Sequence, residues 1–532
     1  MGIFISVPKT VECAVTAIVL ACLLCVAVYK QAGVLQSSGY SNKKYFDWVK
    51  RQGNLAFQRF VFLAMMCALS SAAIGLAFSF AGEWAAVVSL AAYLVFFVLY
   101  FFADKKVALR SEVTPTPRFK RLYAIAFLVF AIISYLLITL LNFADYVWGN
   151  KVFSYLRYVP LAVMPLSAIP LLMLANGIAK IYEVPHNKKF IRQAKKKLAQ
   201  SNVKVIAITG SYGKTTTKNI LFDLLSEKYR VLTTPRSHNT PIGIALAVNN
   251  ANLEDYDIFI AEMGARHIGD IAELCEICPP DYSLITGICG QHLETFLTFK
   301  NIVNAKAEIL SATKNVTVIA DDAFDLFADF NYNKSRCACA TDIVSGKDGT
   351  EFTLTLGGES KRVKTKLLGE HSANNIALAA EAAFAVGMTL DEIASAIGGI
   401  DYIEHRLQLI ESGGVNILDD GYNSNVKGAR AALKVLKYFD GRKIVVTPGL
   451  VELGVLEEDE NSALGKELVG FDLVILVGDT LVKFVEKGYK ASGGDMEKIV
   501  VMPTLASAQE ELKGYLHSGD TVLFLNDLPD IY

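Results

Sequence analysis

The sequence predicts a multi-pass α-helical membrane region followed by α/β domains. Three observations support this prediction. Long apolar stretches crowd the first third of the chain, strand-like and helix-like segments alternate after residue 200, and a glycine-rich loop joins the first of these strands to a helix. Strands that alternate with helices are typical of parallel, doubly wound sheets. We therefore expect a P-loop central domain with such a sheet, and a smaller Rossmann-like α/β C-terminal domain.

Length and composition suggest where these parts begin and end. A chain of 532 residues is too long for a single hydrophobic core. We expect a membrane region over 1–182, a basic linker over 183–200, a central ATPase domain over 201–403 and a C-terminal domain over 404–532. The formal net charge is −1, so no overall positive field argues for a nucleic acid partner.

The first third contains five stretches that are long and apolar enough, or nearly so, to cross a bilayer. A helical span needs about 20 apolar residues. The mean hydropathy of the whole chain, +0.35, is high because of these stretches. The five expected spans are Val11–Tyr29, Ala56–Phe80, Trp84–Ala103, Leu122–Phe143 and Tyr158–Ala179.

The charges between these stretches predict an orientation. Lysine and arginine gather in the connections 30–59 and 104–121 and after the last span, whereas the other two connections are nearly uncharged. By the positive-inside rule the N-terminus lies outside, and everything beyond residue 180 lies in the cytoplasm. We therefore expect a multi-pass protein of the cell membrane, with the lipid bilayer as a partner. The basic run 188–197 is either a linker helix against anionic lipid or a solvated basic helix.

The nine cysteines show no secreted disulfide framework. Cys275 and Cys278 have the spacing of a metal-binding pair, but their possible mates, Cys337 and Cys339, are separated by only one residue. We favour structural thiols over a metal site.

The stretch IAITGSYGKTTT, residues 206–217, carries the clearest chemical signal. An apolar strand breaks at Gly210, a short polar loop follows, and Lys214 opens a helix. Backbone N–H groups of such a loop face an anion, the lysine reaches the β- and γ-phosphates, and the Thr215 hydroxyl can ligate Mg²⁺. A chance glycine-rich turn is disfavoured by the strand before it and the helix after it. The expected nucleotide-binding residues of the loop are Gly210, Ser211, Gly213, Lys214, Thr215 and Thr216.

Two further polar residues follow buried strands. Glu262 ends the buried-strand pattern 257–261, and His292 follows the strand 282–286 after a short glycine-containing segment. In an open parallel sheet, ligands bind outside the carboxyl ends of the strands, so both residues should converge with the P-loop on one crevice. Taken singly, Glu262 could be a surface acid and His292 a helix cap. Together they favour a joint site for Mg²⁺ and a nucleotide.

Three blocks resemble the Mur ligase family, most of all the type that adds D-Ala-D-Ala (MurF). They are the loop G-S-Y-G-K-T-T-T, the block E-M-G-A at Glu262 and the block HLETFLTFKNIVNAKAEI over 292–309, and the likeness extends over most of 201–470. The resemblance implies that Glu262 and His292 ligate Mg²⁺. It also implies that Lys306 is carbamylated and helps to hold a second Mg²⁺, since a carbamate offers hard oxygen ligands where an ammonium would repel the ion.

Later motifs extend the resemblance. Gly369–Asn375 is similar to the family pattern G-x-H-N-x-x-N, whose last asparagine reads the adenine, although Ser372 replaces the inner asparagine. Arg406 matches an arginine that reaches the nucleotide phosphates, and the motif D-D-G-Y-N-S-N places Asp420 and Asn423 at the ATP cleft. The resemblance thus implies a catalytic set of Lys214, Asn239, His292 and Lys306, further nucleotide contacts from Asn375, Arg406, Asp420 and Asn423, and metal ligation by Thr215, Glu262, His292 and Lys306.

The expected function is an ATP-dependent amide ligase that uses ATP and Mg²⁺. A carboxylate is phosphorylated, and an amino-acid or dipeptide amine then attacks the acyl phosphate. The resemblance implies a cell-wall peptide precursor as the carboxylate. Because apolar stretches stand where Mur ligases carry a UDP-sugar domain, a lipid-linked acceptor or a poly-γ-glutamate type of ligase are alternatives. A membrane NTPase is the competing class, against which Lys306 and the second α/β domain argue. An inactive scaffold is disfavoured because the P-loop and metal-site residues are all present.

Overall fold

The structure is a computed structural model. It describes residues 7–51, 95, 98, 113–148, 167–235, 238–290, 293–330, 335–422, 425–451 and 453–525. The chain divides into two compact units, one that runs to His186 and one from Asn187 to Leu528. The two units are described separately.

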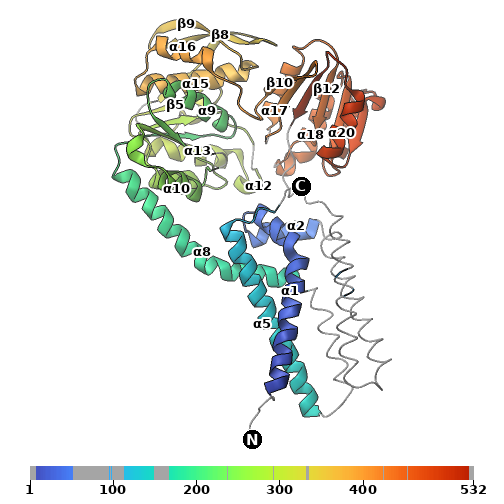
Figure 1. The fold of residues 1–532 in the computed structure, drawn as a ribbon. Coiled ribbons are helices and arrows are strands. Elements are labelled where there is room, and N and C mark those ends of the chain that lie inside the picture. The colour runs from blue at the N-terminus through green and yellow to red at the C-terminus, as the bar shows by residue number, and fades with distance from the viewer. Residues whose placement is uncertain are drawn as a thin grey trace. The chain divides into compact units, whose positions relative to one another are not determined.

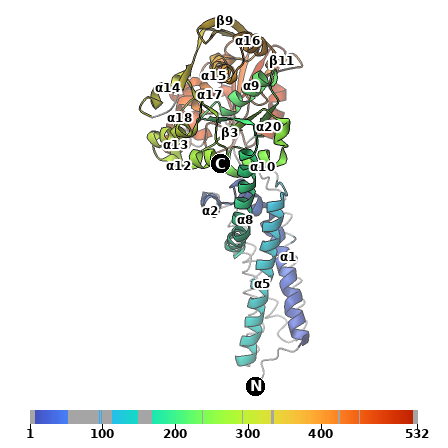
Figure 2. The same ribbon diagram turned by 90° about the vertical axis from the view of Figure 1, so that its left-hand side faces the viewer.

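The first unit is helical. It contains α1 (Val7–Ser37), α2 (Asn42–Arg51), α5 (Pro117–Trp148) and the start of α8 (Ala168–Ala199). Helices α1 and α5 lie side by side (Figures 1 and 2), and the Tyr123 hydroxyl donates to the Cys25 carbonyl oxygen at 2.5 Å.

Two of the described helices are long and apolar enough to cross a membrane, judged by length and composition. These segments are Cys13–Ser37 in α1 and Pro117–Leu140 in α5, and they overlap two of the five predicted spans. The predicted spans 56–80 and 84–103 lie almost entirely outside the described residues, as does the first part of 158–179. Among the described residues, only these two helices therefore support the multi-pass prediction.

Helix α8 replaces the expected boundary between a last span and a separate basic linker. It runs without interruption over Ala168–Ala199. Near its end the Lys197 ammonium donates to the carbonyl oxygens of Val248 and Asn249, at 3.1 and 3.3 Å. These carbonyls belong to the last turn of α10 (Pro241–Asn250), where a helix has no internal donors left and favours a cation. The end of the basic segment is therefore fixed to the central domain.

The central domain is built on a six-stranded parallel sheet, as the sequence predicts. Its strand order is β2-β3-β1-β4-β5-β6, and every neighbouring pair is parallel. The strands are β1 (Lys204–Thr209), β2 (Val231–Thr233), β3 (Ile258–Glu262), β4 (Tyr282–Ile285), β5 (Val316–Ala320) and β6 (Ser335–Ala338).

Each face of this sheet is covered, because alternate residues of a strand point to opposite faces. Ile206 and Ile208 of β1 join a core with α9 (Lys214–Ser226), α15 (Glu370–Val386) and α16 (Leu390–Gly399). Ala207 joins a second core on the other face. That core includes α10, α11 (Asp270–Ile277) and α13 (Phe299–Ala312). The sheet is therefore doubly wound, with helices on both faces.

A small antiparallel sheet follows β6. It contains β7 (Ala340–Gly346), β8 (Gly349–Leu356) and β9 (Glu359–Thr365). Phe352, Leu354 and Val363 are buried against the core that α15 and α16 share with the main sheet. Strand β6 therefore belongs to the parallel sheet, and the three strands that follow it form a sheet of their own.

The C-terminal domain has its own six-stranded sheet, with the order β10-β11-β15-β12-β13-β14. Only β10 is antiparallel to its neighbour. The last described strand, β15, lies in the middle of this sheet and not at its edge. The strands are β10 (Gln408–Ser412), β11 (Val415–Asp420), β12 (Lys443–Thr447), β13 (Leu473–Val477), β14 (Ile499–Met502) and β15 (Thr521–Leu525), and the helices are α17 (Val426–Leu436), α18 (Glu457–Glu467), α19 (Val482–Ala491) and α20 (Leu505–Tyr515).

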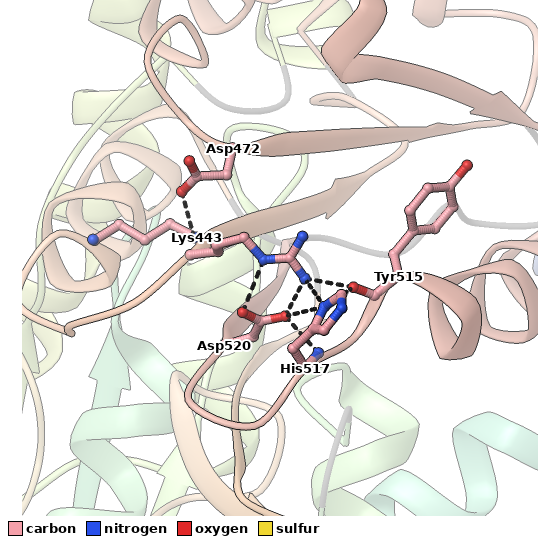
Figure 3. Close-up of polar contacts among 6 residues, drawn as sticks. Lys443, Asp472, Tyr515, His517 and Asp520 are labelled. Carbon is pink, nitrogen blue, oxygen red and sulfur yellow. Dashed lines mark hydrogen bonds and ion pairs between the residues drawn. The ribbon is translucent and has the colours of Figure 1, made fainter.

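An ion pair closes the amino-terminal edge of the C-terminal sheet. The Arg442 guanidinium makes two bonds to the Asp520 carboxylate, at 3.0 and 2.6 Å, and only 4% of the Asp520 side chain is exposed. Figure 3 shows His517 beside this carboxylate and the Tyr515 carbonyl oxygen, which accepts from Arg442. Arg442 directly precedes β12 and Asp520 directly precedes β15, so the pair fixes two neighbouring strands at the edge opposite the candidate site.

Removing the arginine should destabilise the fold, because it leaves a buried carboxylate without its cation. Arg442→Met should lower the free energy of unfolding by about 2 kcal/mol, the range of hydrogen bonds to charged groups. Arg430→Met is the matched control, since Arg430 pairs with Glu467 at the surface and should cost less than about 1 kcal/mol. Denaturant unfolding of the purified protein measures both.

The same pair should depend on pH. The hydrogen bond from Arg442 holds the pKa of Asp520 below its ordinary value, which is about 3.9. A lowered carboxyl pKa stabilises the fold above the ordinary value, and the contribution is lost as the pH falls through the lowered one. The difference between wild type and Arg442→Met should therefore shrink below about pH 4. A difference that grows on acidification would contradict this account.

Candidate active site

The P-loop follows β1 and ends where α9 begins at Lys214. Gly210 has φ +147°, and a Cβ atom there would lie 2.0 Å from Thr286 Oγ1. Gly213 has φ +79°, and a Cβ atom there would lie 2.9 Å from Asn375 Oδ1. Both positions therefore require glycine, for backbone conformation and for space. The loop therefore lies directly against the residue that follows β4 and against α15.

The side chain of Lys214 folds back over the loop. Its ammonium donates to the carbonyl oxygens of Gly210 and Ser211, at 2.8 and 3.0 Å. Burial lowers the pKa of Lys214, and the neighbouring Glu262 carboxylate opposes that shift. A cation is thus centred over the loop, where a nucleotide phosphate would gain most from it.

Glu262 is the carboxylate at the centre of the site. It is the last residue of β3, pairs with Ile208 of β1, and is only 4% exposed. The Thr215 hydroxyl lies 3.2 and 3.1 Å from its two oxygens, and Asn239 Nδ2 lies 3.4 Å from one of them. Burial alone would raise the pKa of Glu262, but the ammonium groups of Lys218 and Lys214 outweigh burial, and the pKa is lowered.

Lys218 completes this network and was not predicted from the sequence. It lies one helical turn after Lys214, is 2% exposed, and its ammonium is 3.2 Å from a Glu262 oxygen. It also donates to the Thr234 carbonyl oxygen at 2.9 Å, while the Thr234 hydroxyl accepts from the Glu262 backbone N–H at 3.1 Å. The sequence did contain a signal for this residue. Lys218 follows Lys214 by four residues in one helix, and residues four apart lie on the same face of a helix.

Lys306 lies on α13 and is 3% exposed. Burial, with a further contribution from the Lys214 charge, lowers the pKa of Lys306 to about 7. The Glu308 carboxylate, two residues further on, accepts from the backbone N–H groups of Gly269 and Ala272 at 2.6 and 2.9 Å. This contact fixes α13 to the start of α11 and with it the position of the lysine.

Two cavities meet over the P-loop. The first, of about 440 Å³, is lined by the loop, Asn239, Glu262 and Lys306. The second, of about 330 Å³, is lined by Asn375 and Asp420. The residues that line both cavities are Tyr212, Gly213, Thr216, Arg406 and Asn425. The first cavity therefore gathers cationic and oxygen-donor groups, the second holds the expected nucleoside contact, and the C-terminal domain contributes to both.

The second cavity shows what each predicted nucleoside residue does. Asn375 Oδ1 lies 3.4 Å from the Thr217 hydroxyl, which places the amide beside the loop. Ser372, by contrast, is buried and donates to the Leu368 carbonyl oxygen at 2.7 Å. Its hydroxyl proton is thus donated to the segment just before α15, although Ser372 also lines the second cavity.

Two predicted residues of the C-terminal domain reach this region. The Arg406 guanidinium donates to the Tyr422 carbonyl oxygen at 2.9 Å and lies over the Tyr422 ring, 4.6 Å from its centroid. The Asp420 carboxylate accepts from the Leu407 backbone N–H at 3.2 Å. The turn that carries Arg406 is thus fixed to the end of β11.

The structure gathers ten of the predicted site residues around the first cavity and two more around the second. The first group is Gly210, Ser211, Gly213, Lys214, Thr215, Thr216, Asn239, Glu262, Lys306 and Arg406, with Asn375 and Asp420 around the second cavity. His292 and Asn423 lie outside the described residues.

The oxygen donors of the first cavity fit Mg²⁺. This ion is typically held by one or two carboxylates together with nucleotide phosphates and water, not by a cage of protein ligands. Thr215 and Glu262 supply such hard donors side by side, and in the part of the chain that the structure describes no three His, Cys, Asp or Glu side chains form a metal cluster. Mg²⁺ would therefore be shared between these two residues and a bound nucleotide.

Comparison with known proteins shows which segments of the chain match a known family. Residues 208–383 match the Mur ligase middle domain, and residues 405–526 match the Mur ligase glutamate ligase domain. These segments belong to the Mur ligase family. The P-loop, Glu262, Lys306 and Asn375 lie in the first Mur ligase segment, and Asp420 lies in the second. Residues before 208, including the helical unit, match neither segment.

Two curated relatives and one solved structure, all ligases of one type, show the similarity. The chain is 31% identical over 298 residues to the UDP-N-acetylmuramoyl-tripeptide–D-alanyl-D-alanine ligase of Escherichia coli, covering 52% of this chain and 65% of that protein. It is 29% identical to the Bacillus subtilis enzyme of the same name, covering 51% of this chain and 62% of that protein. A solved MurF ligase from Thermotoga maritima in complex with ADP has a TM-score of 0.59 and 26% identity, over 65% of this chain and 81% of that one. The chain thus spans just under two thirds of these curated relatives.

Loss of the buried lysine should destabilise the central domain. Lys218→Met leaves Glu262 buried without its nearest cation, and removing one partner of a buried pair costs about 3 kcal/mol or more. Lys314→Met is the matched control, since Lys314 pairs with Asp281 with 60% of its side chain exposed and should cost less than about 1 kcal/mol. Both variants are measured by denaturant unfolding. Equal losses of unfolding free energy would show that the buried pair stabilises the fold no more than the exposed pair does.

Proposed function

We propose that this protein is an ATP-dependent amide ligase of the Mur ligase type. The proposed substrates are a muramoyl peptide with a free carboxylate and D-alanyl-D-alanine as the amine, as the names of the matched ligases suggest. The observation that carries the proposal is the single cavity in which the P-loop lysine, the Thr215–Glu262 pair and the buried Lys306 meet. An NTPase that only hydrolyses its nucleotide does not need Lys306.

The chemistry would proceed in two balanced steps. The substrate carboxylate attacks the γ-phosphorus of ATP, the bond to the bridging oxygen breaks, and an acyl phosphate and ADP form. The amine nitrogen then attacks the acyl carbon, the bond to the phosphate oxygen breaks, and the amine loses a proton, which leaves the amide and phosphate. Lys214 and the loop N–H groups would hold the phosphates throughout, and grouping three reactants in one site removes most of the entropic barrier.

Mg²⁺ would be held by Thr215, Glu262 and His292, and carbamylated Lys306 would hold a second ion. When bound, the ions neutralise charge that develops on the transferring phosphoryl group. Burial of Lys306 beside Lys214 disfavours its ammonium form, and a neutral amine is the form that reacts with carbon dioxide. A carbamate there would also replace repulsion from Lys214 with attraction.

We further propose that the ligase domains are attached to the cell membrane, with the N-terminus outside and the domains in the cytoplasm. The two long apolar helices α1 and α5 and the basic connections of the sequence support this arrangement.

Membrane attachment predicts the behaviour of the full-length protein on fractionation. It should stay in the membrane pellet after an alkaline carbonate wash, which releases peripheral proteins but not spanning helices. An N-terminal tag should be cleaved by protease added to intact spheroplasts, and a C-terminal tag should be protected. Release by carbonate, or protection of both tags, would contradict the proposed topology.

Phosphate release tests the ligase proposal. With ATP, Mg²⁺ and bicarbonate, the purified full-length protein should release phosphate only when the muramoyl tripeptide and D-alanyl-D-alanine are both present. Separate reactions with UDP-linked and lipid-linked peptide distinguish the two forms of acceptor. Release that needs no amine would indicate an NTPase and contradict the proposal.

Lys306→Ala should lower turnover by about 100-fold or more, the scale seen when a charged group of a phosphoryl-transfer site is lost. Short carboxylic acids such as formate or acetate should restore part of it, since they can occupy the place of the missing carbamate. Lys300→Ala, on the exposed surface at the start of the same helix, is the control. Unchanged turnover in Lys306→Ala would remove this residue from the mechanism.

A further inference from the structure

A three-residue cluster joins the P-loop to the C-terminal domain. The Tyr212 hydroxyl donates to the Asp322 carboxylate. The Lys427 ammonium donates to both, at 3.1 Å from the Tyr212 oxygen and 3.1 Å from Asp322 Oδ2, and lies 5.2 Å from the centroid of the Tyr212 ring. The three hydrogen bonds close a triangle between the hydroxyl, the carboxylate and the ammonium.

The three side chains come from three separate elements. Tyr212 lies within the P-loop, between Ser211 and Gly213. Asp322 lies in the short helix α14 (Asp321–Phe324) that follows β5, and Lys427 lies in the first turn of α17 in the C-terminal domain. Only Lys427 comes from outside the central domain, so it alone makes the cluster depend on contact between the domains.

The tyrosine ring is held from its other side as well. A Cβ atom on Gly287 would lie 1.9 Å from Tyr212 Cζ, so the ring packs directly on the backbone after β4. The Tyr212 carbonyl oxygen accepts from the Thr286 hydroxyl. The ring therefore has a fixed place, at the border that the two cavities share.

The charge of Asp322 matters because of where it lies. Its carboxylate lines the second cavity together with Asn375, so a bound nucleotide would bring its own negative charges near it. An unneutralised carboxylate there would oppose nucleotide binding. Lys427 lines the same cavity and neutralises it.

A second cross-domain pair lies on the same helix. Lys434, seven residues after Lys427, has its ammonium 2.8 Å from Glu370, at the start of α15. Both carboxylates line the second cavity. Residues seven apart share one face of a helix, so α17 presents a lysine-bearing face to the acidic rim of the nucleoside cavity.

We propose that Lys427 is a nucleotide-positioning residue that the C-terminal domain supplies to the P-loop. It neutralises Asp322 and, with Asp322, fixes the Tyr212 ring between the two cavities, so that affinity for a nucleoside triphosphate depends on contact between the domains. This inference rests on the proposed function, since it assigns the two cavities to one nucleotide.

Direct binding of a nucleotide tests the inference. The probe is the non-hydrolysable analogue β,γ-methylene-ATP with Mg²⁺, titrated into the full-length protein in detergent at low salt. Lys427→Met should raise the Kd about three- to fivefold, the range of an exposed ion pair. The difference should vanish in about 0.5 M KCl, because salt screens exposed charges. Lys427→Arg should keep most of the wild-type affinity.

Lys437→Met is the matched control. Lys437 is exposed, directly follows α17, and lies over the Phe471 ring of its own domain at 5.7 Å. It should leave the Kd unchanged and give the same melting temperature as Lys427→Met. In turnover, Lys427→Met should raise the KM for ATP and leave kcat within about twofold, since the residue acts on binding.

A second variant tests the reason for the effect. Asp322→Asn removes the charge that Lys427 neutralises, so the double variant Lys427→Met/Asp322→Asn should bind the analogue more tightly than Lys427→Met alone. Equal Kd values for Lys427→Met and Lys437→Met would overturn the inference, and so would losses that simply add in the double variant.

The outcomes separate this inference from the ligase proposal. A wild-type protein that binds the analogue but joins no amine to either carboxylate would remove the ligase proposal and leave the inference in place. Equal Kd values for Lys427→Met and Lys437→Met, together with amide formation by the wild type, would overturn the inference and leave the ligase proposal in place. A wild-type protein that binds no analogue would overturn both.

Discussion

The site depends on one buried carboxylate. Glu262 is held at the end of β3 between the P-loop helix and Asn239, and it keeps its negative charge in spite of burial because Lys218 and Lys214 stand beside it. Loss of the carboxylate, or of the two ammonium groups, would leave the opposite charge buried without compensation. The network thus holds the Thr215 hydroxyl and the carboxylate together as one pair of oxygen donors. The remaining groups of the cavity are arranged around that pair.

Parallel sheets explain why so many distant residues meet here. The P-loop and Glu262 follow neighbouring strands of the central sheet, and the carboxyl end of a parallel sheet is the edge at which ligands bind. The C-terminal domain brings Asp420, from the end of its own strand β11, to the second cavity. The opposite edge of the C-terminal sheet is closed by the Arg442–Asp520 pair.

Several contacts and one strand position could not be predicted from the sequence, for physical reasons. Tyr212 is a bulky residue in a loop otherwise made of small ones, but its partners Asp322 and Lys427 lie far along the chain, and no local pattern connects them. Ser372 occupies a position where the family pattern has an amide, yet its hydroxyl donates to the Leu368 carbonyl oxygen just before α15. Strand β15 comes last in the described chain and lies in the middle of its sheet, an order that only long-range pairing decides.

The sequence by itself determined the α/β class, the P-loop and the strand-end positions of the polar residues, because strand period, glycine placement and helix starts are local properties. Only the tertiary structure decided which residues share a cavity, that Lys218 neutralises Glu262, and that a lysine of the C-terminal domain contacts the P-loop. Those relations depend on the distance between residues that are remote along the chain. They depend also on burial and on neighbouring charges, which together set the charge of Glu262 and the pKa of Lys306 and which no stretch of sequence displays.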